Sequence, residues 1–216
     1  SLIQKSKAKL NILFIHVGKC AGGSILNTLR SIFPSSVIKI WEYHCFDAQY
    51  LLSNLNQLLV SKKNAIVLIS TRDPVDRFIS SYNWDYYIHV LKRSPSSQLK
   101  IDEWYEEFSS IGKLINSLQK TSSKERALEF INFKHHGYGH MRMGISWYLN
   151  FQTLITLNSS QVFCVRLENL KEDLLGFINY ISKLAGLKER KKLCMIHDKS
   201  NYKELLSKQY FSADSS

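Results

Sequence analysis

Two short segments of the sequence carry residue types that bind phosphate or sulfate groups. The first is the glycine-rich loop Gly18–Gly23, which follows the apolar run Asn11–Val17 and leads directly into Ser24. Glycines let successive backbone N–H groups turn toward an anion, and the N-terminus of a following helix adds partial positive charge. We therefore expect this loop to bind an anion through its backbone.

The loop differs from a Walker A nucleotide-binding loop in the place of its lysine. The Walker pattern G-x-x-x-x-G-K-[ST] has a lysine just before the hydroxyl residue. Here Ser24 follows Gly23 directly, and the lysine stands at the front of the loop as Lys19. The backbone can still surround an anion, but the ammonium group reaches it from another direction. This opens the question of whether a magnesium ion is needed.

The second segment begins at Arg72, directly after the apolar run Ala65–Thr71. Open α/β sheets bind ligands at the carboxyl ends of their strands, which is where Arg72 would lie. Ser80 follows eight residues later, about two helical turns along. If the chain between them forms a turn and then a helix, both side chains can reach one anion. From these residues alone, an Arg72–Asp73 ion pair that caps a helix beginning at Pro74 is an equal alternative.

Strands and helices alternate along the chain. We expect strands at Asn11–Val17, Val37–Trp41, Ala65–Thr71 and Gln161–Arg166, and helices at about Ser24–Phe33, Phe46–Val60, Val75–Asn83 and Leu170–Leu184. The pattern predicts an α/β fold, with a P-loop-like parallel β-sheet flanked by helices. We interpret residues 1–216 as one domain, in which a helical, aromatic-rich insertion at about 84–151 binds the acceptor.

The composition agrees with a globular protein that binds an anion. The net charge is +11, from 29 Lys and Arg against 18 Asp and Glu, which suits either an anionic ligand or a solvated basic surface. We interpret the basic cluster Lys188–Lys192 as an exposed helix end rather than a binding patch. No apolar run reaches the ~18 residues that a membrane span needs. The four cysteines have no metal-type spacing, so no metal site is expected. A cytoplasmic location is favoured, with a lumenal one as the alternative if the chain is a piece of a longer protein.

Together the two segments resemble the sulfotransferases that use 3′-phosphoadenosine-5′-phosphosulfate (PAPS), in particular the carbohydrate branch with its H-I-P-K-T-x-G-T-S loop. Residues His16–Ser24 correspond to that loop, with Gly18 where proline is usual and Cys20 and Gly23 where threonine is usual. Residues Arg72–Tyr82 match the motif R-D-P-x-x-R-[FW]-x-S-x-Y in full. Residues Val165–Leu174 are similar to the late strand and E-x-L-x-x-D-[LF] helix start of the family.

The resemblance implies a site for each end of PAPS. The loop residues that would bind the 5′-phosphosulfate are Gly18, Lys19, Cys20, Ala21, Gly22, Gly23 and Ser24. Lys19 would also be catalytic, because it would contact the bridging oxygen and the transferred group. Arg72 and Ser80 would bind the 3′-phosphate. The implied reaction is the transfer of a sulfuryl group from PAPS to an acceptor hydroxyl, on a carbohydrate by family resemblance.

The reaction also needs a base for the acceptor hydroxyl, and histidine is the most common choice near neutral pH. His44 follows the second predicted strand, at the sheet edge where both phosphate segments lie, and we take it as the base. Glu42 and His140 are the alternatives. His16 is interpreted as a packed strand-end residue, and the segment His135–His140 as an acceptor-facing or structural loop rather than a zinc site.

Two other functions remain open at this point. A magnesium-dependent P-loop nucleotide kinase would explain the loop and the sheet, but the Walker A lysine is missing. A non-enzymatic basic module that binds nucleic acid or heparin would explain the charge, but no nucleic-acid-binding motif is present and no nucleic-acid partner is expected. The acceptor and the oligomeric state cannot be read from the sequence.

Overall fold

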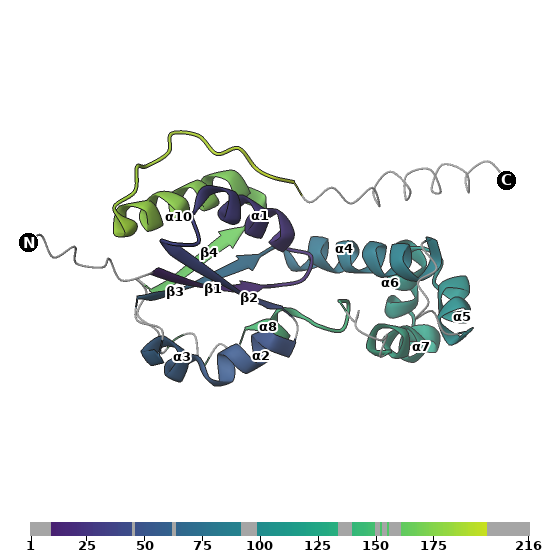
Figure 1. Cartoon of the computed structure of the whole chain (residues 1–216). Helices are drawn as coiled ribbons and strands as arrows, with labels where there is room; N and C mark the ends of the chain where they lie inside the picture. The colour runs from purple at the N-terminus through teal and green to yellow at the C-terminus, as the bar shows by residue number, and fades with distance from the viewer. Residues whose placement is uncertain are drawn as a thin grey trace, which may run out of the picture. The chain divides into compact units, whose positions relative to one another are not determined.

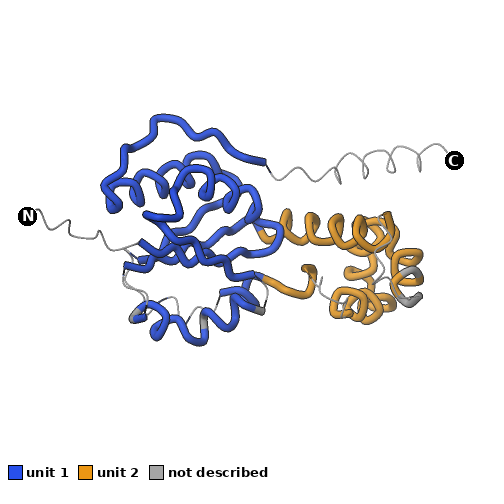
Figure 2. Tube along the Cα trace, viewed as in Figure 1, with its two compact units in different colours: residues 1–73, 145–198 blue, residues 74–144, 199–216 orange. Residues whose placement is uncertain are grey.

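The chain folds into two compact units, shown in Figure 2. The first comprises residues 1–73 and 145–198, and the second residues 74–144 and 199–216. The structure is a computed structural model of the whole chain. It describes residues 10–44, 46–61, 64–91, 99–133, 140–149, 152, 155 and 161–197.

A parallel sheet of four strands forms the centre of the first unit. Its strands are β1 (Leu10–His16), β2 (Ile38–His44), β3 (Ala65–Thr71) and β4 (Val162–Arg166), in the order β2-β1-β3-β4. Strands β1 and β3 are apolar on both faces, as strands that are covered on both sides must be. The predicted α/β fold with a parallel sheet flanked by helices is confirmed.

Helices cover both faces of this sheet (Figure 1). Helices α1 (Gly22–Ile32) and α10 (Leu170–Ala185) lie on one face, where Ile25 and Leu29 pack in one buried cluster with Leu174 and Ile178. Helices α2 (Phe46–Ser53), α3 (Leu55–Ser61) and α8 (Ile145–Tyr148) lie on the other face. Because the strands are parallel, their carboxyl ends meet at one edge of the sheet, and the segments that follow β1, β2, β3 and β4 all start there.

The second unit is helical. It contains α4 (Pro74–Tyr86), a π-helical turn η1 (Tyr87–Leu91), α5 (Leu99–Glu107), α6 (Ile111–Gln119) and α7 (Thr121–Asn132). Its core is aromatic and includes Tyr82, Trp104, Tyr105, Phe108 and Phe130. This unit begins at Pro74 and its main segment ends at Gly144, whereas the insertion was expected at about 84–151; that it binds the acceptor stays a prediction.

Three local predictions differ from the structure. Strand β2 extends to His44, beyond the predicted end at Trp41, so that Glu42 and His44 lie on the strand itself. The single helix predicted over Phe46–Val60 is two helices, with Asn54 between them. The basic cluster Lys188–Lys192 is not a helix end, because α10 stops at Ala185 and the chain from Leu187 to His197 is neither helix nor strand.

Among the residues that the structure describes, no helix is long and apolar enough to cross a membrane.

Candidate active site

The loop between β1 and α1 has an unusual backbone. Lys19 and Ala21 both have positive φ angles, 67° and 60°, although neither is glycine. The left-handed conformation costs such residues about 1–2 kcal/mol, so the surrounding structure must hold them in it. Ala21 is left-handed, and from Gly22 onward the chain is right-handed helix. This change of hand turns successive N–H groups toward one side and makes a concavity that suits an anion.

The start of α1 adds to this concavity. The first hydrogen bond of the helix runs from the N–H of Ile25 to the carbonyl of Ala21, at 3.0 Å. The N–H groups of Gly22 and Gly23 precede that bond, and the first N–H groups of a helix have no partner within the helix. No acidic residue lies in the first turn, so nothing there offsets the partial positive charge of the helix end. The structure thus brings the predicted residues of Ala21–Ser24 together at one helix terminus.

Cys20 makes two contacts within the loop. Its side chain is buried, with the thiol 3.7 Å from the carbonyl oxygen of Gly18. Its backbone N–H donates to the carbonyl of Val17, at 3.2 Å. Both donors of Cys20 are therefore used within the loop. These contacts give Cys20 a role in the shape of the turn, and its binding of the cofactor stays a prediction.

Gly22 is a glycine for a steric reason. A Cβ atom at this position would overlap Cδ2 and Nε2 of the His16 ring. The imidazole of His16 thus lies directly against the first residue of α1. Because the ring occupies this space, residue 22 cannot carry a side chain while His16 stays in place.

The other side of the His16 ring contacts β2. Its Nδ1 lies 2.8 Å from Oε1 of Glu42, and since an ionised carboxylate can only accept a hydrogen bond, Nδ1 carries the proton. His16 and His44 are opposite each other in the β1–β2 register, and their rings meet edge to face with centroids 4.2 Å apart. His16 is packed, as expected, but no local pattern indicated its bond to Glu42. His16, Glu42 and His44 form one cluster at the edge of the sheet, which we call the histidine–glutamate cluster.

The environment of Glu42 makes it a weak base. The hydrogen bond from His16 lowers the pKa of Glu42 against an opposing effect of desolvation, and the charges of His16, Arg30 and His44 lower it further. Arg30 lies 4.0 Å from Oε2. Because the pKa is lower in the folded chain, this carboxylate stabilises the fold above its unfolded-state pKa and loses that contribution as the pH falls through the folded-state pKa. At neutral pH Glu42 is ionised and hydrogen-bonded, which favours His44 as the base.

The second predicted segment follows β3, and a late part of the sequence supports it. Arg72 comes directly after Thr71, the last residue of β3. The N–H of the next residue, Asp73, donates to Oε1 of Glu168 at 2.7 Å. This bond lowers the pKa of the Glu168 carboxyl. Glu168 therefore holds the turn that presents Arg72.

Glu168 is placed in turn by the residues around it. Arg166, at the end of β4, contacts Asp173 through both Nε and Nη2 at 2.9 Å, and its N–H donates to the same carboxylate at 2.9 Å. This double contact ties the end of β4 to the first turn of α10. The segment Val165–Leu174, identified from the sequence only as similar to a family motif, thus has a structural role at the sheet edge.

Within the second unit, two residues of the Arg72–Tyr82 motif stabilise the helices. Arg77 is buried and donates through Nη2 to the carbonyl of Met143 at 2.6 Å. Tyr82 is buried and donates through its hydroxyl to the carbonyl of Phe108 at 2.6 Å. Ser80 is half-buried on α4. Because Arg72 belongs to the first unit and Ser80 to the second, their convergence on one phosphate stays a prediction.

His140, one of the alternative bases, is buried in the second unit. Its Nδ1 lies 3.1 Å from Oδ1 of Asp85, and the side chains of the two residues are 8% and 0% exposed. Its carbonyl accepts a hydrogen bond from Arg77, at 3.4 Å. A base must reach the acceptor oxygen to about 3 Å. These contacts favour a structural role for His140 within its unit and leave Glu42 as the main alternative to His44.

The described residues contain no group of three or more His, Cys, Asp and Glu side chains that could hold a metal ion. The histidines His135 and His136, considered above for zinc, lie outside the described residues.

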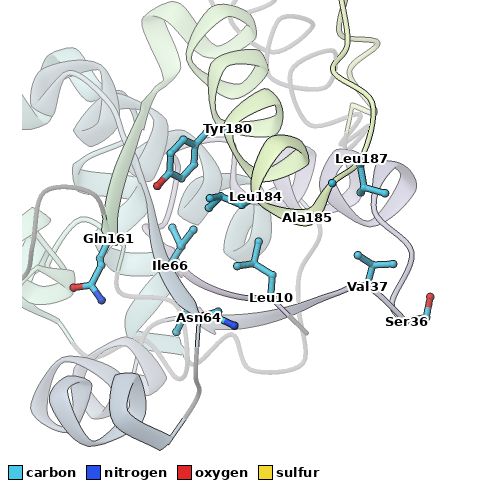
Figure 3. A pocket seen from close by; sticks show the side chains of 12 residues that line it. Leu10, Ser36, Val37, Asn64, Ile66, Gln161, Tyr180, Leu184, Ala185 and Leu187 are labelled. Atoms are coloured by element: carbon cyan, nitrogen blue, oxygen red, sulfur yellow. The ribbon is translucent and has the colours of Figure 1, made fainter. Parts of the chain in front are cut away.

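A pocket of about 660 Å³ opens at the other edge of the sheet (Figure 3). It lies at the first residues of β1 and β3, Leu10 and Ala65, and at the end of α10, including Leu184 and Leu187. None of its lining residues is charged; the polar ones are Ser36, Asn64, Gln161 and Tyr180. A ligand with several negative charges needs cationic or N–H donors, so this pocket does not suit a nucleotide.

Comparison with known proteins gives one structural resemblance to report. No protein-family model matches the sequence, and no curated protein is similar enough to count as a match. A crystal structure of a sulfotransferase from Alicyclobacillus acidocaldarius aligns with 96% of this chain and 93% of its own, at 16% sequence identity and a TM-score of 0.45. At this sequence identity and TM-score the match records a likeness and carries no conclusion about function.

Proposed function

We propose that this protein is a sulfotransferase that moves a sulfuryl group from PAPS to a hydroxyl group of a carbohydrate, by in-line displacement. The observation that carries the proposal is the backbone of the loop after β1. Two non-glycine residues, Lys19 and Ala21, are held in the left-handed conformation directly before a helix start that has no acidic residue. Such a loop suits an anionic group bound by backbone N–H groups.

The residues of the sheet edge divide into two sets for the two ends of the donor. Backbone N–H groups of Ala21–Ser24 would bind the 5′-phosphosulfate, with the ammonium of Lys19 beside the bridging oxygen. Arg72, held at the end of β3 by the Asp73–Glu168 contact, would bind the 3′-phosphate together with Ser80. PAPS, when bound, supplies a sulfuryl group activated by its link to phosphate.

The chain itself must then remove a proton and stabilise negative charge. His44 would take the proton from the acceptor hydroxyl as the new oxygen–sulfur bond forms. The ammonium of Lys19 would stabilise the charge that develops on the bridging oxygen as the old sulfur–oxygen bond breaks. Sulfuryl transfer, like phosphoryl transfer, depends mainly on such alignment and charge stabilisation.

The first prediction concerns recognition of the 3′-phosphate. We expect 3′,5′-ADP to bind much more tightly than 5′-AMP, because hydrogen bonds to charged groups contribute roughly 1.5–3 kcal/mol each. Isothermal calorimetry with both nucleotides measures the difference. Arg72→Ala should remove most of this preference and leave the affinity for 5′-AMP nearly unchanged. Equal affinity of the wild type for the two nucleotides would exclude the PAPS assignment.

The second prediction separates binding from chemistry at the loop. Lys19→Ala should lower turnover far more than affinity for 3′,5′-ADP, since the ammonium acts on charge that appears as the bond breaks. Loss of one such donor typically costs on the order of 10²–10³ in rate. Single-turnover kinetics and calorimetry on the same preparations measure both effects.

The same preparations distinguish a sulfotransferase from the nucleotide kinase and from the non-enzymatic binding module. EDTA should leave sulfuryl transfer largely intact, and a strict requirement for magnesium together with tighter binding of ATP would favour the nucleotide kinase. Binding of heparin or DNA without any binding of 3′,5′-ADP would favour the non-enzymatic module.

A further inference from the structure

The basic cluster Lys188–Lys192 lies on a segment that is neither helix nor strand. The chain leaves α10 through Gly186, whose φ is 66°, and runs from Leu187 to His197 with a bend at Lys191. We call residues 187–197 the basic strap. Its cations are Lys188, Arg190, Lys191 and Lys192, its one carboxylate is Glu189, and all five are exposed.

Hydrogen bonds from two helices fix the backbone of the strap. The side chain of Asn179 on α10 accepts from the N–H of Arg190 at 2.8 Å and donates to its carbonyl at 3.0 Å. Farther along, the hydroxyl of Thr28 on α1 accepts from the N–H of Ile196, at 3.0 Å. These bonds lie on either side of Lys191 and Lys192, so the second half of the cluster is held in place.

Apolar side chains of the strap face the core. Leu187, Leu193 and Met195 pack against the buried cluster that α1 and α10 form on the sheet. The charged side chains between them are exposed. The segment therefore presents four cations within at most about 13 Å of chain. Because hydrogen bonds already fix its backbone, little conformational freedom remains to be lost when a ligand binds.

We propose that the basic strap binds an anionic carbohydrate chain, as an attachment site for the acceptor away from the reacting hydroxyl. The choice of a carbohydrate rests on the proposed function. A row of cations suits a chain that carries carboxylate or sulfate groups at intervals. Near its end the strap contacts Thr28 through the N–H of Ile196. Thr28 lies six residues along α1 from Gly22, which is about 9 Å of helix from the start of the proposed donor site.

Two other kinds of partner fit the strap less well. Single-stranded nucleic acid is bound on aromatic side chains that stack with bases, and residues 187–197 contain no Phe, Tyr or Trp. A membrane surface requires several apolar side chains that point outward, whereas Leu187, Leu193 and Met195 pack against the core and Ile196 alone of the large apolar side chains in the strap is exposed.

The test compares two sets of lysines with the same charge. One variant carries Lys188→Gln, Lys191→Gln and Lys192→Gln; its control carries Lys39→Gln, Lys171→Gln and Lys183→Gln, which are exposed in the first unit, on β2 and α10. We expect the strap variant to bind a short heparin oligosaccharide roughly 3- to 100-fold more weakly than the wild type. The control should stay close to the wild type. Equal losses in both variants would mean that only net charge matters and would overturn the proposal.

A third variant tests the shape of the strap at constant charge. Asn179→Ala removes both bonds to Arg190 and keeps a good helix former in α10. It should bind the oligosaccharide several-fold more weakly and elute from a plain cation exchanger as the wild type does. Unchanged oligosaccharide affinity would show that the fixed shape has no role and overturn the inference.

Two titrations complete the test. A single-stranded oligodeoxynucleotide of the same charge should bind more weakly than the heparin oligosaccharide. Tighter binding of the oligodeoxynucleotide would mean that the partner of the strap is nucleic acid and not a carbohydrate. Titration with 3′,5′-ADP separates this inference from the proposed function. Nucleotide binding without oligosaccharide binding would overturn only the proposal that the strap binds a carbohydrate. Oligosaccharide binding without nucleotide binding would overturn only the proposal that the protein is a sulfotransferase.

Discussion

Gly22→Ala is expected to destabilise the protein by about 3 kcal/mol and to abolish binding of 3′,5′-ADP. The added methyl group would overlap the His16 ring, and forcing atoms into a packed site typically costs 1–3 kcal/mol. The ring has little room to move, because it stacks on Phe14 and contacts Glu42 and His44. For a chain of this size the melting temperature should fall by roughly 6–12 °C. Thermal denaturation and calorimetry measure the two effects.

The chain offers both a control and a suppressor for this variant. Gly176→Ala adds the same methyl group on α10, where nothing lies within 4 Å of it, and should be neutral or stabilising because alanine favours helix over glycine. His16→Ala in the Gly22→Ala background removes the obstructing ring and should restore much of the stability and some nucleotide affinity. A double variant no better than Gly22→Ala alone would show that the collision with His16 is not the cause.

The features that depend on local pattern were predictable from the sequence. Buried parallel strands are continuous apolar runs, so β1 and β3 and the edge at their carboxyl ends followed directly. The glycine loop could be recognised because its spacing and its place between a strand and a helix are both local. Strand β2 was predicted too short because Trp41–His44 alternates polar and aromatic residues, which is typical of a half-covered edge strand rather than a central one.

The features that depend on contacts between distant residues were not predictable. The His16–Glu42 bond joins residues 26 apart, and the Asp73–Glu168 bond residues 95 apart. Only the alignment of β1 beside β2, and of β3 beside β4, brings these pairs together. The strap was missed for the same reason, since Asn179 and Thr28 hold it through contacts that no local pattern shows. A signal was nevertheless present, because the apolar residues Leu187, Leu193 and Met195 flank the charged run on both sides.

His44→Ala is expected to lower the turnover rate by about 10²–10⁴-fold while the affinity for 3′,5′-ADP stays close to that of the wild type. A positioned general base typically contributes on that scale, and the donor is proposed to bind at the loop and at Arg72 instead. His197→Ala is the matched control. It removes a histidine that is exposed at the end of the strap, beyond its cations, and at saturating acceptor it should keep the wild-type rate. Single-turnover measurements with PAPS and a carbohydrate acceptor give the rate directly.

The pH profile distinguishes His44 from Glu42, the other candidate in the histidine–glutamate cluster. If His44 is the base, the acid limb of the wild-type profile should be lost in His44→Ala. If Glu42 is the base, the acid limb should lie below the ordinary range for glutamate, because the hydrogen bond from His16 lowers the pKa of Glu42. Glu42→Gln keeps an oxygen that can accept from His16 and removes the negative charge, so it should cost much less than His44→Ala. A larger loss in Glu42→Gln, together with the lower acid limb, would transfer the role of base to Glu42, with His16 as the residue that orients it.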